Sequence, residues 1–222
     1  VGCMIIPMIF MMRRSLKETE DFASRQHHPT TKEILSNLAS NWRIVISGML
    51  LVATTTTMFY FITVYTPTFG KEVLHLTTKE SLIATIMVGV SNFVFLPIGG
   101  HLSDKFGRRT LLLATSFLIL LTAYPLLNWL THSISLGHLM ISLLWLSLLY
   151  SFYNGAMVVT LTEIMPREVR TSGFSVAYSL ATSVFGGLTP VIATFIVQQT
   201  GSKTSPAFWL MFAAVLSLIT VL

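Results

Sequence analysis

Long apolar blocks separated by short polar loops constrain this chain more than any other feature. A helix that crosses the hydrocarbon core of a bilayer needs about 20 largely apolar residues. Four blocks reach that length, and they cover Ile44–Thr66, Ser81–Leu102, Thr110–Leu130 and His138–Leu161. A fifth block, from Thr171 to about Gln199, is long enough to cross at a tilt. We therefore expect an all-α membrane protein with five complete spans.

The composition agrees with a lipid environment and argues against a nucleic-acid partner. Hydrophobic residues make up 53% of the chain and charged residues 10%, whereas about a quarter of the residues in soluble domains are charged. The net charge is +5. The basic residues stand in loops beside apolar blocks and are not interleaved with aromatic residues on one face, so we expect no nucleic acid to bind.

Both ends of the sequence are apolar and short. Residues 1–12 form an apolar run that is too short to cross a bilayer, and Ala207–Leu222 is still apolar at the last residue. We expect both runs to be parts of spans, and the chain to be a piece of a longer protein. Within the fifth block, Gly186, Gly187 and Pro190 predict a broken or bent helix.

The distribution of lysine and arginine predicts which loops face the cytoplasm. Alternate loops carry eleven and three of these residues in total. By the positive-inside rule, the loops at residues 13–43, 105–109 and 167–170 are expected on the cytoplasmic side of the inner membrane. The resulting topology is that of a multi-pass protein with short external turns.

Two local patterns predict helix starts. Thr30-x-x-Glu33 has the form of a capping box and is followed by apolar residues at helical spacing, which indicates a short amphipathic helix on the membrane surface. Thr77-x-x-Glu80 repeats the capping box before the second span. His27 and His28 lack further ligands at metal-binding spacing, so we expect no metal and no cofactor.

The most specific segment is the loop from Gly99 to Arg109. Gly99 and Gly100 would let two helices approach closely, and Gly107 would permit a sharp turn. Asp104 could accept hydrogen bonds from the N-terminal end of a neighbouring helix. Arg108 and Arg109 could pair with an acidic residue, and the best-placed one is Glu163, at the same predicted end of the fourth span and close to Arg170.

These charges have two interpretations. A cluster that forms when helix ends converge and breaks when they separate would act as a cytoplasmic gate. The predicted gate residues are Gly100, Asp104, Gly107, Arg108, Arg109, Glu163 and Arg170. Alternatively, the three arginines only fix the orientation of the protein in the membrane.

Several runs of residues resemble a known family. Gly100-x-x-x-Asp104-Lys105-x-Gly107-Arg108-Arg109 resembles the loop signature of the major facilitator superfamily in its second-half copy, with Lys105 where arginine is commoner. Glu163-x-x-Pro166-x-x-x-Arg170-x-x-Gly173 resembles the following loop of that superfamily. The run 185–190 resembles its metabolite and proton symporters, and the runs 60–68, 153–157 and 205–211 are similar to citrate and tricarballylate proton symporters.

The resemblance implies a fold and a function. Residues 1–12 would be the end of transmembrane helix 6, residues 13–43 the central cytoplasmic loop, and residues 44–222 helices 7 to 12, the last one truncated. The fold would be the C-terminal six-helix half of a twelve-helix major facilitator fold. The implied function is proton-coupled symport of a tricarboxylate, citrate or tricarballylate, by alternating access. Symport of 2-oxoglutarate, shikimate or proline/betaine, or a sensor that binds a solute without moving it, remains open.

Polar residues at mid-membrane depth are the candidate ligands. None of the five spans carries Lys, Arg, Asp or Glu near its middle, although an organic anion and a coupled proton need such groups. We expect them in an N-terminal half of the same protein. Tyr60 and Asn154 are the predicted substrate contacts, since the resemblance places their spans at the central cavity. Hydroxyl and amide groups at Thr54–Thr57, Tyr65, Asn92, Tyr178, Ser179 and Thr182 are expected to pack or to bond to their own helix.

Other classes of membrane protein are less consistent with the residues. A channel would show rings of pore-lining charge or a carbonyl filter, and an intramembrane enzyme would need a cluster of His, Asp or Glu within its spans. The sequence has neither, so we expect a transporter and not an enzyme.

Overall fold

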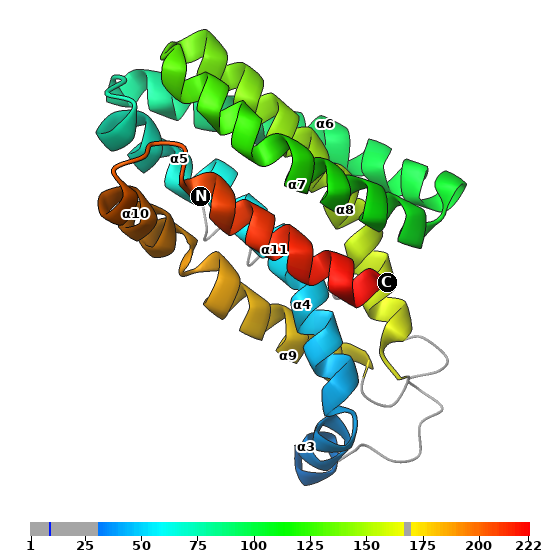
Figure 1. Ribbon diagram of the computed structural model, residues 1–222. Helices are drawn as coiled ribbons and strands as arrows, with labels where there is room; N and C mark the ends of the chain where they lie inside the picture. Colours follow the sequence, from blue (N-terminus) through cyan, green and yellow to red (C-terminus); the bar gives the residue numbers. More distant parts are fainter. Residues whose placement is uncertain (1–8, 10–30, 167–169) are drawn as a thin grey trace. The chain divides into compact units, whose positions relative to one another are not determined.

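The computed structural model describes residue 9 and residues 31–166 and 170–222. Over these residues it is built from helices, some of which are short π-helices (Figure 1). The helices are α3 (Thr31–Ser40), α4 (Trp42–Phe59), η2 (Tyr60–Tyr65), α5 (Thr66–Thr68), η3 (Phe69–Val73), α6 (Thr78–Phe106), α7 (Arg108–His132), α8 (Leu136–Ile164), α9 (Arg170–Ala181), η4 (Thr182–Gly186), α10 (Thr189–Thr200) and α11 (Pro206–Val221). Contacts divide the chain into two units, Val1–Ser36 and Asn37–Leu222, and the membrane-spanning helices belong to the second.

Five apolar segments within the described residues are long enough to cross a membrane, which confirms the predicted number of spans. They are Trp42–Val73, Thr78–Phe106, Arg108–His132, Leu136–Ile164 and Arg170–Thr200. A shorter apolar helix, α11, follows them. Each span runs a few residues beyond its apolar block, because polar residues in the first and last turns extend a helix into the interface.

The start of α6 confirms the second capping box. The Glu80 amide donates to Thr77 Oγ1 at 3.3 Å, and the Thr77 amide donates to Glu80 Oε2 at 2.9 Å. These two bonds satisfy backbone N–H groups that have no partner inside a helix. The predicted short helix in the first loop is also present as α3, but Thr30 of its capping box lies outside the described residues. The same is true of His27 and His28 and of nearly all of residues 1–12.

The first span changes from α-helical to π-helical hydrogen bonding just before a proline interrupts the backbone hydrogen bonds. Pro67 has no N–H to donate, so the carbonyls before it need other partners. The six residues of η2 take up π-helical geometry, and the Thr66 hydroxyl donates to the carbonyls of Phe61 and Ile62 at 3.1 and 2.9 Å. The span therefore continues as one bent helix to Val73, beyond the predicted end at Thr66.

The fifth span is broken as its glycines and proline predict. After α9, the chain forms the π-helix η4, and the Gly187 amide donates to the Thr182 carbonyl at 2.7 Å. A new helix, α10, then begins with Pro190 in its first turn, where a missing N–H costs nothing.

Helix α4 lies among the other helices of this unit (Figure 1). It contacts α11, α9 and α8, while α6 and α7 pack on α8, and α7 also packs on α11. Its run of four threonines is buried. Thr54 Oγ1 donates to the Ala213 carbonyl of α11 at 2.7 Å, so a hydroxyl group links the two helices where lipid and apolar side chains offer no acceptor.

Candidate functional site

The signature loop forms the sharp turn that the sequence predicts between α6 and α7. Helix α6 ends at Phe106, Gly107 has φ +86°, and α7 starts at Arg108. This φ lies in the region that side chains with a Cβ rarely adopt, so glycine is needed there. The turn places Arg108 and Arg109 in the first turn of α7.

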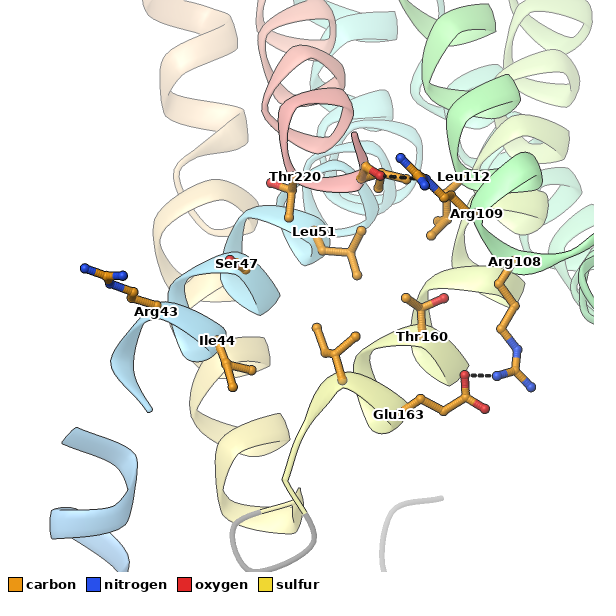
Figure 2. A pocket seen from close by; sticks show the side chains of 12 residues that line it. Arg43, Ile44, Ser47, Leu51, Arg108, Arg109, Leu112, Thr160, Glu163 and Thr220 are labelled. Carbon is orange, nitrogen blue, oxygen red and sulfur yellow. Dashed lines mark hydrogen bonds and ion pairs between the residues drawn. The ribbon is translucent and has the colours of Figure 1, made fainter. Parts of the chain in front are cut away.

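Arg108 forms an ion pair with Glu163, which lies in the last turn of α8 (Figure 2). The pair joins two spans that meet at the end where the sequence predicts the cytoplasm. The side chains of Arg108 and Glu163 are 32% and 56% exposed. Exposed pairs of this kind contribute only about 0.2–1 kcal/mol. The link is therefore weak enough to open and close at little cost.

The other predicted gate charges do not join this ion pair. Arg109 instead donates to the carbonyls of Val221 and Leu222, at 3.1 and 2.7 Å. Asp104 and Arg170 are exposed, and neither forms a hydrogen bond or ion pair with another described residue. The hydrogen bonds expected at Asp104 are thus not formed in this structure.

Glycines bring α6 and α8 together at one crossing. A Cβ added to Gly99 would lie 2.6 Å from the Ser151 carbonyl oxygen, and one added to Gly155 would lie 2.7 Å from the Gly100 nitrogen. Gly99 therefore permits the close approach of two helices, as the sequence predicts. A Cβ at Gly100 would meet no described atom within 4 Å, so the contact does not require glycine at that position. Sequence reasoning missed Gly155. Its signal was a glycine inside an apolar span, next to two further small or polar residues.

On the N-terminal side of this crossing along α6, a buried polar network joins the same two helices. Asn92 Oδ1 accepts hydrogen bonds from the hydroxyls of Ser147 and, at 3.2 Å, Ser151. Ser91 Oγ lies 2.7 Å from Ser147 Oγ. Asn92 was expected to pack rather than to bind substrate, and its oxygen is indeed satisfied inside the protein.

Tyr60 lies where the two irregular segments meet. It is the first residue of η2, and its ring packs against η4, because a Cβ added to Gly186 would lie 2.8 Å from Tyr60 Cδ2. Tyr178 of α9 lies near Tyr60 and also near Tyr150 of α8. Three spans thus bring phenol groups to one region.

Asn154 follows Tyr150 by one turn on the same face of α8. Tyr150 in turn lies beside Phe59, the neighbour of Tyr60, with ring centroids 5.8 Å apart. The Asn154 side-chain oxygen is buried and has no hydrogen-bond partner among the described residues. A buried acceptor without a partner costs about 1–3 kcal/mol, so such a group needs an explanation.

The middle of each span carries neutral groups only. In the described helices, charged residues occur in the first or last turns or close to them, as the sequence analysis anticipated. The interior therefore offers hydroxyls, phenols and amides, which can bind a polar solute but cannot by themselves neutralise a polyanion.

Comparison with known proteins places this chain in a family. Residues 8–222 match the family model described as "Sugar (and other) transporter". The chain is 56% identical to the citrate-proton symporter of Salmonella typhi over 218 residues, which are 98% of this chain and 50% of that protein. It is 53% identical to the citrate-proton symporter of Klebsiella pneumoniae, over 98% of this chain and 49% of that protein.

More distant relatives are also transporters. The proline/betaine transporter of Escherichia coli strain K12 is 29% identical over 81% of this chain and 35% of that protein. No solved structure matches the chain. The chain spans about half the length of these two citrate-proton symporters, and it aligns with their C-terminal half. Its helical architecture agrees with half of a major facilitator fold. This multi-pass membrane chain belongs to the sugar (and other) transporter family of the major facilitator superfamily, whose members are transporters and not enzymes.

Proposed function

We propose that the protein carries citrate together with protons across the inner membrane by alternating access, and that this chain forms one half of the transport pathway. The observation that carries the proposal is the identity of 53–56% to two proteins named citrate-proton symporters, over 98% of the chain. Relatives that are named for proline and betaine are only 29% identical.

The interior of the described helices carries only neutral groups, which supports a model in which the two halves of the protein supply different groups to the transport site. Citrate needs cationic or multiple hydrogen-bonding partners, and proton coupling needs a group that titrates within the membrane. We place the cationic substrate ligands and the titrating group in an N-terminal half of the protein. The half described here then supplies hydroxyl and amide groups to the substrate and part of the gate.

The Arg108–Glu163 pair is the centre of the proposed cytoplasmic gate. It links α7 to α8 with partly exposed charges, so that a modest change in the separation of the two helices breaks it. Gly107 sets the direction in which α7 leaves the turn. Gly100, Asp104, Arg109 and Arg170 lie at or near the same end of their helices, and we include them in the proposed gate.

Accumulation in proteoliposomes tests the proposed function. The full-length protein is reconstituted, a proton gradient is imposed, and uptake of citrate, tricarballylate, 2-oxoglutarate and betaine is compared. We expect citrate to accumulate above its external concentration only while the gradient persists. A sensor would bind citrate without accumulating it, and preferential uptake of another solute would overturn the substrate assignment.

Asn154 gives a test of the proposed substrate contact. Replacing it with alanine removes an unpaired buried oxygen, so the melting temperature should stay the same or rise. If the amide binds substrate, the KM for citrate should rise by about tenfold. This factor corresponds to the loss of one hydrogen bond that contributes about 1.4 kcal/mol.

Asn92→Ala is the matched control because the same amide is removed from the facing helix. Its oxygen accepts two serine hydroxyls, so this change should lower the melting temperature. Tyr60→Ala should raise KM as Asn154→Ala does. An unchanged KM in both of these variants would assign Tyr60 and Asn154 to packing.

A further inference from the structure

The end of α8 is shaped by the proline that follows it at position 166. A residue that precedes proline is disfavoured in the helical region of φ and ψ. Met165 accordingly leaves the helix in an extended conformation, with φ −77° and ψ 128°, just after α8 ends at Ile164. Its side chain is 1% exposed, although its neighbours Glu163 and Ile164 are exposed. The thioether is therefore buried within two residues of the carboxylate of the proposed gate.

Two glycines make room for this side chain, one on α4 and one on α9. A Cβ added to Gly48 would lie 2.9 Å from Met165 Cε, and one added to Gly173 would lie 2.9 Å from Met165 Sδ. Both glycines are buried, and α4 and α9 pack against each other. An unbranched, flexible thioether is suited to such a narrow space. Met165 thus connects the end of α8 to two other spans.

The end of α8 is less firmly packed where it borders a cavity of about 490 Å³ (Figure 2). Helix α8 contributes Thr160, Glu163 and Ile164 to the lining of this cavity. The ion pair between Glu163 and Arg108 links α8 to α7 at this level. An exposed ion pair stabilises weakly, whereas burial of an apolar side chain stabilises more strongly. The buried methionine therefore holds the end of α8 more firmly than the ion pair does.

We propose that Met165 is a positioning residue of the cytoplasmic gate. Its thioether, held between Gly48 and Gly173, keeps the end of α8 where Glu163 can pair with Arg108. This role rests on the proposed function, because the gate is part of it. When the end of α8 moves away from α4 and α9, the thioether leaves the space between the glycines and the ion pair separates. Opening then exposes an apolar side chain, which favours the paired state.

Thiol crosslinking across the gate tests this role without any transport measurement. The full-length protein, with its native cysteines replaced by serine, carries Arg108→Cys and Glu163→Cys. It is treated in membranes with a short bifunctional thiol reagent, and the crosslinked peptides are quantified by mass spectrometry. The two cysteines remove the ion pair, so the yield depends on the remaining contacts of the α8 end. We expect Met165→Ala to lower the yield about fivefold, because the cavity left by a truncated core side chain lets the helix end move.

Three further variants define the contact. Met157→Ala truncates another buried methionine about two turns earlier in α8, and it should leave the yield unchanged. Met165→Leu keeps the apolar volume and should retain most of the yield. Gly173→Ala pushes against the thioether from the α9 side and should lower the yield. It takes the place of Met165→Ala if that variant does not assemble.

An unchanged yield in Met165→Ala, or in Gly173→Ala where it takes that place, would overturn the role of Met165. An equal fall in Met157→Ala would overturn it too. Citrate uptake, measured with the native Arg108 and Glu163, tests the gate separately. Met165→Ala should lower the maximal rate of uptake and leave KM unchanged, because the predicted substrate contacts are other residues. A lower crosslinking yield with normal uptake would support the positioning by Met165 and overturn the proposed gate.

Discussion

Replacing Gly155 with alanine is expected to destabilise the protein by about 1–3 kcal/mol, the usual cost of overpacking a close contact. The added Cβ would lie 2.7 Å from the Gly100 nitrogen and 2.8 Å from the Gly99 carbonyl carbon. Both are backbone atoms, which no change of rotamer can move aside. Helices α6 and α8 would have to separate, and the hydrogen bonds of Asn92 to Ser147 and Ser151 would weaken with them.

Gly137→Ala is the matched control, because it makes the same change in the first turn of the same helix. A Cβ at Gly137 would meet only Ser135 Oγ, at 3.8 Å, which is ordinary contact. Alanine also has a higher helix propensity than glycine, by about 1 kcal/mol. Thermal unfolding of the purified full-length protein should therefore show a lower melting temperature for Gly155→Ala and an equal or higher one for Gly137→Ala. Equal values for both variants would mean that the close crossing is absent from the protein in the membrane.

Reversing one charge of the Arg108–Glu163 pair should reduce citrate uptake by about tenfold or more, and reversing both should restore much of it. Arg108→Glu places two carboxylates together, and Glu163→Arg places two guanidinium groups together. Repulsion at this distance opposes the state in which the helix ends meet. The double variant Arg108→Glu/Glu163→Arg recreates an attractive pair with exchanged partners. Uptake is measured at matched amounts of protein in the membrane.

Glu163→Arg decides between the two interpretations of these charges. If the arginines serve only to orient the protein, an additional positive charge in a cytoplasmic loop should be harmless or favourable. If the pair is a gate, the same substitution should impair uptake while the amount and orientation of the protein stay normal. Lys79→Glu reverses a charge at the opposite end and is a control for non-specific effects. Normal uptake by Glu163→Arg would leave orientation as the role of Arg108.

Features that depend on local chemistry could be predicted from the sequence. The five spans follow from the lengths of apolar blocks, the turn at Gly107 follows from the conformational freedom of glycine, and the Thr77–Glu80 capping box follows from residue spacing. The break near Gly186 and Pro190 also follows from residues within one segment. In each case a few neighbouring residues determine the geometry.

Features that depend on the register between helices could not be predicted. Whether an acid near Arg108 pairs with it depends on how far α8 extends beside α7, and the sequence did not indicate that Asp104 would stay unpaired. The contact of Gly155 with Gly100, and the contrast between a satisfied Asn92 and an unsatisfied Asn154, likewise arise only when α6 and α8 are placed side by side. Such contacts bring together residues that are more than 50 positions apart.

The packing of Tyr60 against Gly186 has a consequence for how this protein can evolve. The two irregular segments, η2 and η4, meet at this contact, and any residue larger than glycine at position 186 would push into the tyrosine ring. A smaller residue at position 60 would in turn leave a void beside the break in the fifth span. A larger residue at position 186 is therefore expected to be accepted only together with a smaller side chain at position 60, so that the two irregular segments change together.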